Sequence, residues 1–407
     1  MRVLFKSGER ELPNVGFVLV LPCRSTQDVV DAIGHAWGTG AHLVPRGGGH
    51  CFAGRSATDG IVLDLSGLNR ITVADDGTAT IGAGASLGRV YPALHARGRT
   101  IPAGCGATVG IAGLTLGGGI GLLGRRYGLT CDRLVRARVV LADGRVVDCD
   151  ADREPDLFWA LRGAGGGQFG VVTSLRFATV PEAVTTRIEA HWPGGEAELV
   201  AAWQEWAPKA PDEITANLLI DPTGATLLGA ATLDRETTRD LLRGFTDRPV
   251  DLAEGVPFHQ LKRTLADSDP VGPLRIRSEF FSRTMSFPTI ESLVDGLTPA
   301  PTPRQLSFTA MGGAYNRVAG HTTAFAHRNE HFLLEHIAGE GDGWVDESWT
   351  TAHTEGSGRV YPNFPDLALE NPATAYHADN LPRLAAIKKT YDPHQFFDFP
   401  QAIQGAQ

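Results

Sequence analysis

Glycine-rich segments within the first 170 residues constrain the fold of this chain more than any other feature of its sequence. Three of them stand at residues 46–50 (RGGGH), 110–121 (GIAGLTLGGGIG) and 162–170 (RGAGGGQFG). Because glycine has no Cβ, such segments expose backbone N–H groups to an anion such as a diphosphate and can lie flat against a planar ligand. A Rossmann site needs a strand, GxGxxG, a helix and an acidic residue about 20 positions later. None of the three segments has that order, so the sequence predicts a glycine-lined ligand site of another kind.

Composition and charge exclude several other classes of protein. The 407 residues are 42% hydrophobic and carry a net charge of −9, with no dominant cluster of Lys and Arg. This charge disfavours nucleic acid and anionic membrane surfaces as partners. No apolar run approaches the length of a membrane-spanning helix, and the N-terminus lacks the long apolar core of a secretory signal.

Cysteine and histidine spacing predicts neither a disulfide framework nor a metal site. The chain has five cysteines, an odd number, and no pair has CxxC spacing. The pattern HExxH is absent, and His353, His377 and His394 have no spacing typical of metal ligands. We therefore expect no metal and a reduced, cytoplasmic compartment.

Hydrophobic periodicity and glycine content divide the chain into two regions with different patterns of secondary structure. Up to about residue 180, strands and short helices alternate with glycine-rich turns, whereas the following segment has fewer glycines and longer amphipathic stretches. Ser25 is the expected N-cap of the first helix, and the turn at residues 142–144 (ADG) predicts a hairpin. Expected helices cover 25–37, 87–96, 155–162, 196–207, 237–245 and 288–297. Expected strands cover 17–21, 41–44, 61–65, 78–82, 134–141, 146–150, 171–177, 306–310 and 312–318, and residues 331–336 form a strand or a helix face.

Taken together and in order, the motifs resemble one known family. They are RGGGHCFAGRS, IPAGCGATVGIAGLTLGGGIGLLGRRYGLTCDRL and PDLFWALRGAGGGQFGVVTSLRF, followed in the tail by YPNFPD, YHADN and YDPHQFF. This set resembles the berberine bridge enzyme-like branch of the vanillyl-alcohol oxidase / p-cresol methylhydroxylase flavoprotein superfamily. The resemblance covers nearly the whole chain and is strongest in the first 180 and the last 50 residues.

The resemblance implies an α+β fold and a division into three segments. Residues 1–180 would form an FAD-binding domain of two subdomains. Residues 181–359 would form a substrate-binding domain, an antiparallel sheet backed by helices that roofs the flavin. Residues 360–407 would return to the FAD domain and bring side chains into the active site.

The resemblance also implies which residues bind FAD. His50 stands where the family joins a histidine ring to the flavin 8α carbon, so we expect a covalent link there. Cys51, its neighbour, is expected to pack or hydrogen-bond near the diphosphate. The full expected set is Arg46, Gly47, Gly48, Gly49, His50, Cys51, Cys105, Thr108, Val109, Gly110, Gly113, Gly117, Gly121, Gly170, Val172, Tyr361 and Asn363.

Cys105 departs from the pattern of relatives that hold the flavin twice. Those relatives have a Cys four residues before the Gly of the TVG stretch, a position that Gly106 occupies here. In an extended segment, a shift of one residue turns the side chain to the other face. Single attachment through His50 is therefore favoured, and a second link through Cys105 is the less favoured alternative.

Tyr361 is the catalytic candidate, because the tyrosine of the YxN motif in related oxidases lies over the substrate near the flavin. Its phenolate would accept a proton from a substrate hydroxyl if nearby donors or charges lowered its pKa, which is about 10 in a free tyrosine. Asn363 would then contact the cofactor or hold the loop. The alternative role for Tyr361 is only to orient substrate or to pack on the flavin.

The expected function is that of an FAD-dependent oxidase. It would transfer hydride from an alcohol, sugar or secondary-metabolite substrate to FAD, and O2 would reoxidise the flavin to give H2O2. Amine oxidation comes next, and a natural-product tailoring enzyme that cyclises or desaturates its substrate remains open. So do a dehydrogenase that does not use O2, a flavin-binding protein without turnover, and a non-redox cyclase that uses the fold as a cavity.

Overall fold

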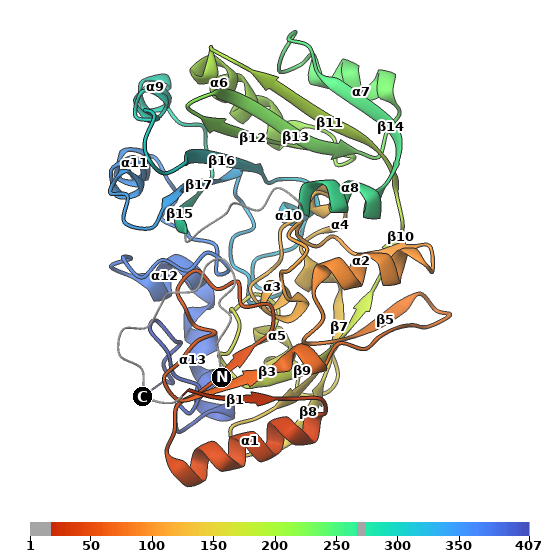
Figure 1. The fold of residues 1–407 in the computed structure, drawn as a ribbon, viewed down its shortest axis with the longest axis vertical. Coiled ribbons are helices and arrows are strands. Elements are labelled where there is room, and N and C mark those ends of the chain that lie inside the picture. Colours follow the sequence, from red (N-terminus) through yellow and green to blue (C-terminus); the bar gives the residue numbers. More distant parts are fainter. Residues whose placement is uncertain (1–17, 267–273, 407) are drawn as a thin grey trace.

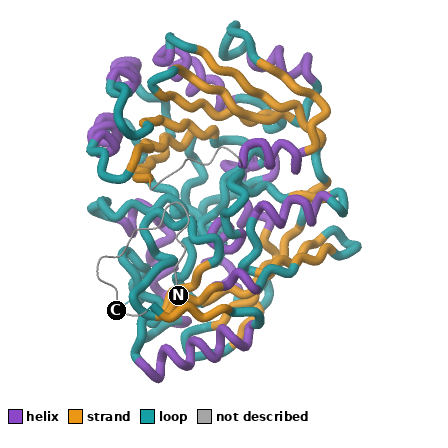
Figure 2. The backbone as a smooth tube through the Cα atoms, in the orientation of Figure 1, coloured by secondary structure: helices purple, strands orange, loops and turns teal. Residues whose placement is uncertain are grey.

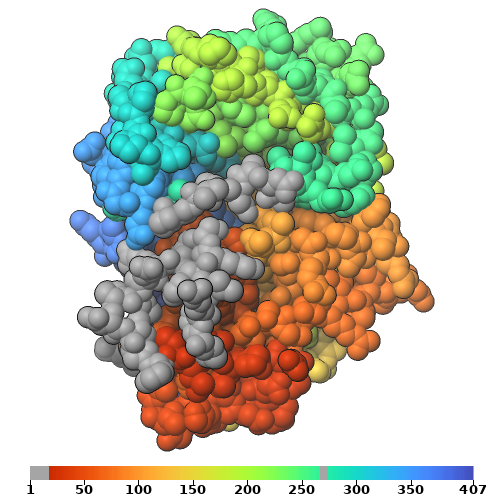
Figure 3. All heavy atoms as spheres, viewed as in Figure 1, coloured from red at the N-terminus to blue at the C-terminus, as the bar shows by residue number. Residues whose placement is uncertain are grey.

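The computed structural model describes residues 18–266 and 274–406. The described chain forms two lobes, with the red-to-orange N-terminal part below and the green-to-cyan middle part above (Figures 1 and 3). The blue C-terminal helices lie beside the N-terminal strands of the lower lobe (Figure 1). Helices and mainly antiparallel sheets confirm the predicted α+β class. Phe17, the first residue of the strand predicted at 17–21, lies outside the described residues.

A small parallel sheet opens the lower lobe, with strands in the order β1-β3-β2. Its elements are β1 (Leu19–Pro22), α1 (Thr26–Thr39), β2 (Leu43–Arg46) and β3 (Ile61–Asp64). The predicted N-cap is confirmed: the Ser25 side chain accepts from the Asp28 N–H, and the Asp28 carboxylate accepts from the Ser25 N–H. β2 runs directly into the first glycine loop, so the edge of this sheet sets where that loop begins.

A five-stranded antiparallel sheet in the order β4-β5-β9-β7-β8 completes the lower lobe. The predicted hairpin is confirmed as β7 paired with β8, and Gly144 in its turn has a φ of 80°, which glycine adopts without strain. The strands are β4 (Ile71–Val73), β5 (Thr78–Gly82), β7 (Leu134–Val140), β8 (Val146–Cys149) and β9 (Val171–Ala178), and the short β6 (Arg99–Thr100) pairs with β10 (Val180–Pro181). The helices are α2 (Leu87–His95), α3 (Ile111–Leu116), α4 (Gly124–Tyr127) and α5 (Pro155–Ala160).

A seven-stranded antiparallel sheet in the order β14-β11-β13-β12-β16-β17-β15 forms the upper lobe. α6, α9 and α11 pack on its outer side (Figures 1 and 2). The strands are β11 (Val184–Trp192), β12 (Ile214–Asp221), β13 (Gly224–Ala231), β14 (Asp251–Pro257), β15 (Leu274–Phe281), β16 (Arg304–Ala310) and β17 (Phe332–Gly339). The helices are α6 (Glu196–Trp206), α7 (Arg235–Leu242), α8 (Phe258–Ala266), α9 (Phe287–Asp295), α10 (Ala314–Arg317) and α11 (Trp344–His353). The domain boundaries at 180 and 359 stay predictions.

The strand predicted at 312–318 is wrong, because β16 ends at Ala310 and the chain then turns into the short helix α10. Gly312 and Gly313 have φ values of 85° and 55°, a left-handed conformation that breaks a strand. A Cβ on Gly312 would also lie 2.7 Å from the backbone oxygen of Pro208, so the turn is packed as well as bent. The turn lets Tyr315 of α10 reach down to the lower lobe, where it is 1% exposed.

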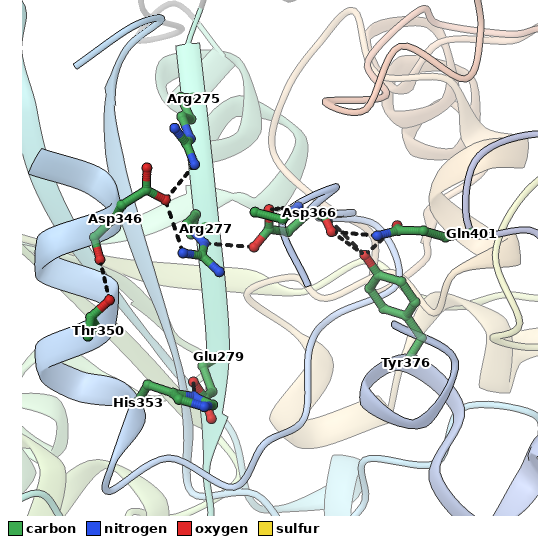
Figure 4. Close-up of polar contacts among 10 residues, drawn as sticks. Arg275, Arg277, Glu279, Asp346, Thr350, His353, Asp366, Tyr376 and Gln401 are labelled. Carbon is green, nitrogen blue, oxygen red and sulfur yellow. Dashed lines mark hydrogen bonds and ion pairs between the residues drawn. The ribbon is translucent and has the colours of Figure 1, made fainter. Parts of the chain in front are cut away.

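The C-terminal segment is tied to the upper sheet by a polar network around the buried pair Arg277 and Asp366 (Figure 4). Arg277 of β15 donates to Asp366 over 2.7 Å and to Asp346 of α11 over 3.0 Å. The Asp366 N–H donates to the Tyr376 hydroxyl, and its carbonyl accepts from the Gln401 side chain, both over 2.8 Å. The segment from 361 to 366 is therefore held between the upper sheet and the tail helix α12 (Pro372–His377).

The last helix, α13 (Leu381–Tyr391), is anchored by a fully buried ion pair. The Lys388 ammonium donates to Asp392 over 2.7 Å, and also to the carbonyls of Gln168 and Phe397. Because Gln168 belongs to the third glycine segment, this pair fixes the tail against the ligand-binding part of the lower lobe.

Replacing this ammonium should therefore weaken the fold. In Lys388→Met the Asp392 carboxylate stays buried without its cation, so we expect the free energy of unfolding to fall by about 3–5 kcal/mol. Urea unfolding followed by tryptophan fluorescence measures this. The adjacent, exposed Lys389 provides the control Lys389→Met, which should change stability by less than about 0.5 kcal/mol. Equal stabilities of the two variants would contradict the anchoring role.

Candidate active site

A cavity of about 620 Å³ lies where the two lobes meet. This volume falls within the range of roughly 300–1,000 Å³ that is typical of small-molecule and cofactor sites. Its floor is the glycine-rich backbone of the lower lobe, and its roof is the inner face of the upper sheet. Side chains of the C-terminal segment, at 361–365 and 397–399, complete the wall.

Backbone contact between two glycine loops builds the floor. A Cβ on Gly48 would lie 2.2 Å from the Gly110 nitrogen, and one on Gly110 would lie 2.4 Å from the Gly48 nitrogen. No side chain fits between these loops, so both positions require glycine to let the loops touch.

Gly113 is glycine for a different reason. It lies in the helix α3, where any residue finds an allowed conformation, and a Cβ there would meet no atom of residues 18–266 and 274–406 within 4 Å beyond the helix's own backbone. Gly113 nevertheless lines the cavity. Glycine at 113 therefore leaves open space on this part of the cavity floor.

The structure brings most of the predicted cofactor-binding residues to the cavity wall. Arg46, Thr108 and Gly117 are the exceptions. Arg46 ends β2 just before the first loop, and Gly117 packs on Asn363, whose Oδ1 lies 2.1 Å from where a Gly117 Cβ would stand. Those that line the cavity are Gly47, Gly48, Gly49, His50, Cys51, Cys105, Val109, Gly110, Gly113, Gly121, Gly170, Val172, Tyr361 and Asn363.

His50 connects the two glycine loops through its ring. Its Nε2 lies 2.7 Å from the Thr108 hydroxyl oxygen, and Thr108 stands two residues before Gly110. Thr108 therefore contributes to the site by orienting the His50 ring rather than by lining the cavity.

Cys105 is part of the cavity wall, and the direction expected for its side chain stays a prediction. Its sulfur lies 3.1 Å from the Nζ of Lys262, which reaches down from α8 and also donates to the Ala103 carbonyl. Lys262 is 2% exposed. A buried cation from the upper lobe thus holds the wall segment that contains Cys105, a contact between positions 157 residues apart that no sequence motif indicates.

Tyr361 lies at the edge of the floor with its hydroxyl directed at the second glycine segment. Its oxygen accepts from the N–H groups of Gly119 (2.9 Å) and Ile120 (3.1 Å) and from Asn363 Nδ2 (2.9 Å). Burial raises the pKa of Tyr361 to about 12, and the three donors act in the opposite direction. Asn363 Nδ2 also donates to the Leu114 carbonyl, so the two residues close the cavity as a unit.

The roof follows from the two-residue period of β-strands. Along β12, β16 and β17, alternate side chains face the cavity, and the residues between them are buried against the outer helices. The positions that line the cavity are Thr215, Asn217, Leu219, Gln305, Ser307, Thr309, Leu333, Glu335 and Ile337. The buried positions between them include Ala216, Leu218, Ile220, Leu306, Phe308 and Leu334.

Glu335 brings a carboxyl group into this roof. It pairs with Ser307 on the neighbouring strand, and burial alone raises its pKa to about 8. Within the described residues, no hydrogen bond or ion pair reaches its carboxyl group. The sequence interpretation treated 331–336 only as a strand or a helix face. Nothing in the sequence separates Glu335 from the adjacent His336, whose ring contacts Ser348 of α11.

Tyr315 is a second residue that sequence reasoning missed. Its hydroxyl accepts from the Gly121 N–H over 3.0 Å and donates to the Gly121 carbonyl over 2.7 Å, and the residue lines the cavity. It went unrecognised because the segment around it was predicted as a strand.

Comparisons with known proteins identify the family to which the chain belongs. The FAD binding domain model matches residues 18–150, and the berberine and berberine-like model matches residues 360–404. The chain is 33% identical over 410 residues to the FAD-linked oxidoreductase YgaK of Bacillus subtilis, an alignment that covers 95% of this chain and 90% of that protein. The chain belongs to the berberine bridge enzyme-like family of FAD-linked oxidoreductases. The resemblance inferred from the motifs is therefore confirmed.

Solved structures of this family share the fold. Physcomitrella patens BBE-like 1 is 29% identical, with a TM-score of 0.87 and coverage of 95% of this chain and 91% of that one. Glucooligosaccharide oxidase from Acremonium strictum is 25% identical, with a TM-score of 0.85 and coverage of 96% and 92%, and is described with a 6-S-cysteinyl, 8α-N1-histidyl FAD. Within residues 18–266 and 274–406, no helix has the length and apolarity to cross a bilayer.

The open space beside Gly113 suits the family's cofactor and can be tested directly. In Gly113→Leu the side chain would extend into the space that FAD needs, and its Cβ meets no atom of the described residues within 4 Å, so we expect a folded protein with little bound flavin. Gly34→Leu is the matched control, since Gly34 is an exposed helical glycine of α1 that also has no atom within 4 Å of its Cβ position. Replacing glycine in a helix gains up to about 1 kcal/mol in either variant. Flavin absorbance per chain and melting temperature are the measurements, and full flavin content in Gly113→Leu would contradict the assignment.

Proposed function

We propose that this chain is an oxidase that removes hydride from an alcohol group of a sugar or secondary metabolite. FAD is bound covalently through His50, and O2 accepts the electrons and leaves as H2O2. The observation that carries the proposal is a single cavity in which a glycine floor faces a polar roof, with the Tyr361 hydroxyl at its edge.

Attachment through His50 is supported by the geometry of its ring. The Thr108 hydroxyl engages Nε2 over 2.7 Å and so holds the ring in one orientation at the cavity wall. The histidyl link described for glucooligosaccharide oxidase is of the same kind. Cys105 lies in the wall, but its sulfur is engaged by Lys262, so single attachment remains the proposal.

The roof supports a hydroxylated substrate. It presents hydroxyl, amide and carboxyl groups from Thr215, Asn217 and Glu335, among others. The buried Thr215 hydroxyl has no hydrogen-bond partner among the residues that the structure describes, and a buried polar group of this kind is satisfied when a ligand supplies the partner. Asn217 and Gln305 each offer both a donor and an acceptor, which suits the hydroxyl groups of a sugar or polyol.

Tyr361 is placed to accept the substrate hydroxyl proton. Bound FAD supplies the two-electron acceptor. The three N–H donors around the phenolic oxygen stabilise negative charge there, as an oxyanion site does. Because burial raises the pKa of Tyr361 to about 12, only a small fraction is ionised at neutral pH, and removal of a proton by Tyr361 speeds as pH rises.

A second candidate function is oxidation of an amine. Glu335 has no cation beside it in the described structure, and a protonated amine would supply one. The dehydrogenase and tailoring alternatives also stand, and O2 consumption with product analysis separates them from the oxidase. We further propose a cytoplasmic location, which the five unpaired cysteines support.

A covalent link predicts that the yellow flavin stays attached to the polypeptide when the protein is denatured. The wild type should remain yellow through acid precipitation, whereas His50→Ala should lose its flavin to the supernatant while still binding FAD through the glycine loops before precipitation. Cys105→Ala is the matched comparison and should retain the flavin with an almost unchanged absorption spectrum. A yellow acid precipitate of His50→Ala, or a clear spectral shift in Cys105→Ala, would place a link on Cys105.

The proton acceptor is tested by the rate of flavin reduction. Tyr361→Phe keeps the ring and removes the hydroxyl, so anaerobic stopped-flow reduction should slow by roughly 10²–10⁴-fold with little change in substrate affinity. The substrate comes from a screen of alcohols, sugars and amines for H2O2 formation. A loss below about threefold with weaker binding would make Tyr361 only a binding residue.

Glu335 is the ionisable group of the cavity roof that would accept the proton if Tyr361 does not, and Glu335→Gln distinguishes these two acceptors. If Glu335 is the base, the rate of flavin reduction in the wild type rises with pH and levels off above the Glu335 pKa of about 8. The Gln variant then loses this pH-dependent increase. If Tyr361 is the base, the rate continues to rise above pH 8 and the Gln variant reduces its flavin at close to the wild-type rate.

A further inference from the structure

Three side chains outside the cavity gather where the two lobes meet. His95 ends α2, Glu182 follows β10, and His259 is the second residue of α8. Figure 1 shows α8 directly above α2, and the two helices are in contact. One ligand atom from each residue lies within 4.8 Å of the others. The positions are 77 or more residues apart along the chain, which is why no spacing in the sequence indicates them.

The Glu182 carboxylate organises this cluster. One of its oxygens faces His95 Nδ1, and the other accepts from His259 Nδ1 over 2.9 Å and from the His259 backbone N–H over 3.0 Å. The Glu182 N–H in turn donates to the Gly98 carbonyl over 2.9 Å, which fixes the carboxylate's position.

The two imidazole rings are stacked, with centroids 3.5 Å apart and an interplanar angle of 25°. Both rings direct the same nitrogen, Nδ1, at the same carboxylate. A zinc ion with bonds of about 2.0–2.2 Å to nitrogen and oxygen needs tetrahedral ligand atoms about 3.3 Å apart. His259 Nδ1 lies 2.9 Å from the carboxylate and all three ligand atoms lie within 4.8 Å of one another, so small side-chain movements bring them to this spacing.

We propose that His95, Glu182 and His259 form a Zn²⁺ site that joins the two lobes. Two imidazoles and one carboxylate are ligands that zinc binds readily, and solvent water would complete the four-coordinate shell. The His95 side chain is 45% exposed, whereas those of His259 and Glu182 are 17% and 10% exposed. The ion therefore has a path in from solvent and two ligands that are held in place by burial.

The site lies close behind the cavity wall. Lys262 stands one helical turn after His259 on α8 and holds Ala103 and Cys105. On α2, the Tyr91 hydroxyl donates to the Gly104 carbonyl over 2.7 Å. An ion that clamps α2 to α8 would therefore fix, from both sides, the wall segment 103–105.

Calorimetric titration of the untagged, flavin-loaded, full-length protein with ZnCl2 tests the proposal after chelator treatment and dialysis. We expect one equivalent to bind to the wild type. In Glu182→Gln and His259→Gln, binding should weaken by more than about 100-fold, beyond the 10–100-fold typical of losing an outer-shell partner. His191→Gln is the matched control, because His191 is exposed on β11 and hydrogen-bonded to Thr226. It should bind like the wild type.

Thermal unfolding and the zinc absorption edge complete the test. ZnCl2 should raise the melting temperature of the wild type and His191→Gln and leave that of the two site variants unchanged, because an ion that binds only the native state stabilises it. The X-ray absorption spectrum of the zinc-loaded wild type should show nitrogen and oxygen neighbours, including imidazole. Failure of the wild type to bind one equivalent, wild-type affinity in both site variants, or a sulfur neighbour that assigns the ion to a cysteine would each overturn the proposal.

Discussion

The hydrogen bonds between the Tyr361 hydroxyl and the glycine-rich backbone below it are the interaction on which the rest of the site depends. They join a residue near the C-terminus to Gly119 and Ile120, about 240 positions earlier. Asn363 reinforces the contact by donating to Leu114 and to the Tyr361 oxygen. The contact closes the cavity and at the same time directs three donors at the oxygen that is proposed to accept a proton.

Tyr361 and Asn363 can approach the second glycine segment closely because most of its residues there have no side chain. A Cβ on Gly117 would lie 2.1 Å from the Asn363 side chain, and glycine at 48 and 110 lets the loops below touch. The glycines thus have two separate tasks. Some bring protein segments together, whereas Gly113 leaves room for a ligand, and only the structure distinguishes the two.

The upper sheet divides its side chains between a core and a site. Along β12, β16 and β17, one face packs against helices through residues such as Leu218 and Phe308, and the other presents polar groups to the cavity. A register shift of one residue would exchange these faces, so the strand pairing that stabilises the fold also sets which groups meet the substrate. Every second residue of these three strands is therefore in a position to contact a molecule bound in the cavity.

Local signals made much of the lower lobe predictable from sequence. The Ser25 cap and the turn at 142–144 depend on neighbouring residues, and the ordered glycine motifs indicated the family. The turn at Gly312 was missed because 312–318 was predicted as a strand, and the positive φ values of Gly312 and Gly313 show only in the structure. Glu335 and the His95–Glu182–His259 group could not be found from the sequence, because segments far away along the chain determine what surrounds these side chains. Cys105 was judged from chain alternation alone, whereas Lys262 of α8 decides what its sulfur contacts.

The central claim is that the glycine-floored cavity holds FAD joined to the His50 ring. Peptide mass mapping of the denatured wild-type protein tests it most directly. Trypsin cleaves after Arg46 and Arg55, so the account predicts one flavin-bearing peptide, residues 47–55, whose fragmentation places the flavin on His50 and not on the adjacent Cys51. Flavin on the peptide that contains Cys105 alone, or a protein that binds no flavin, would contradict it.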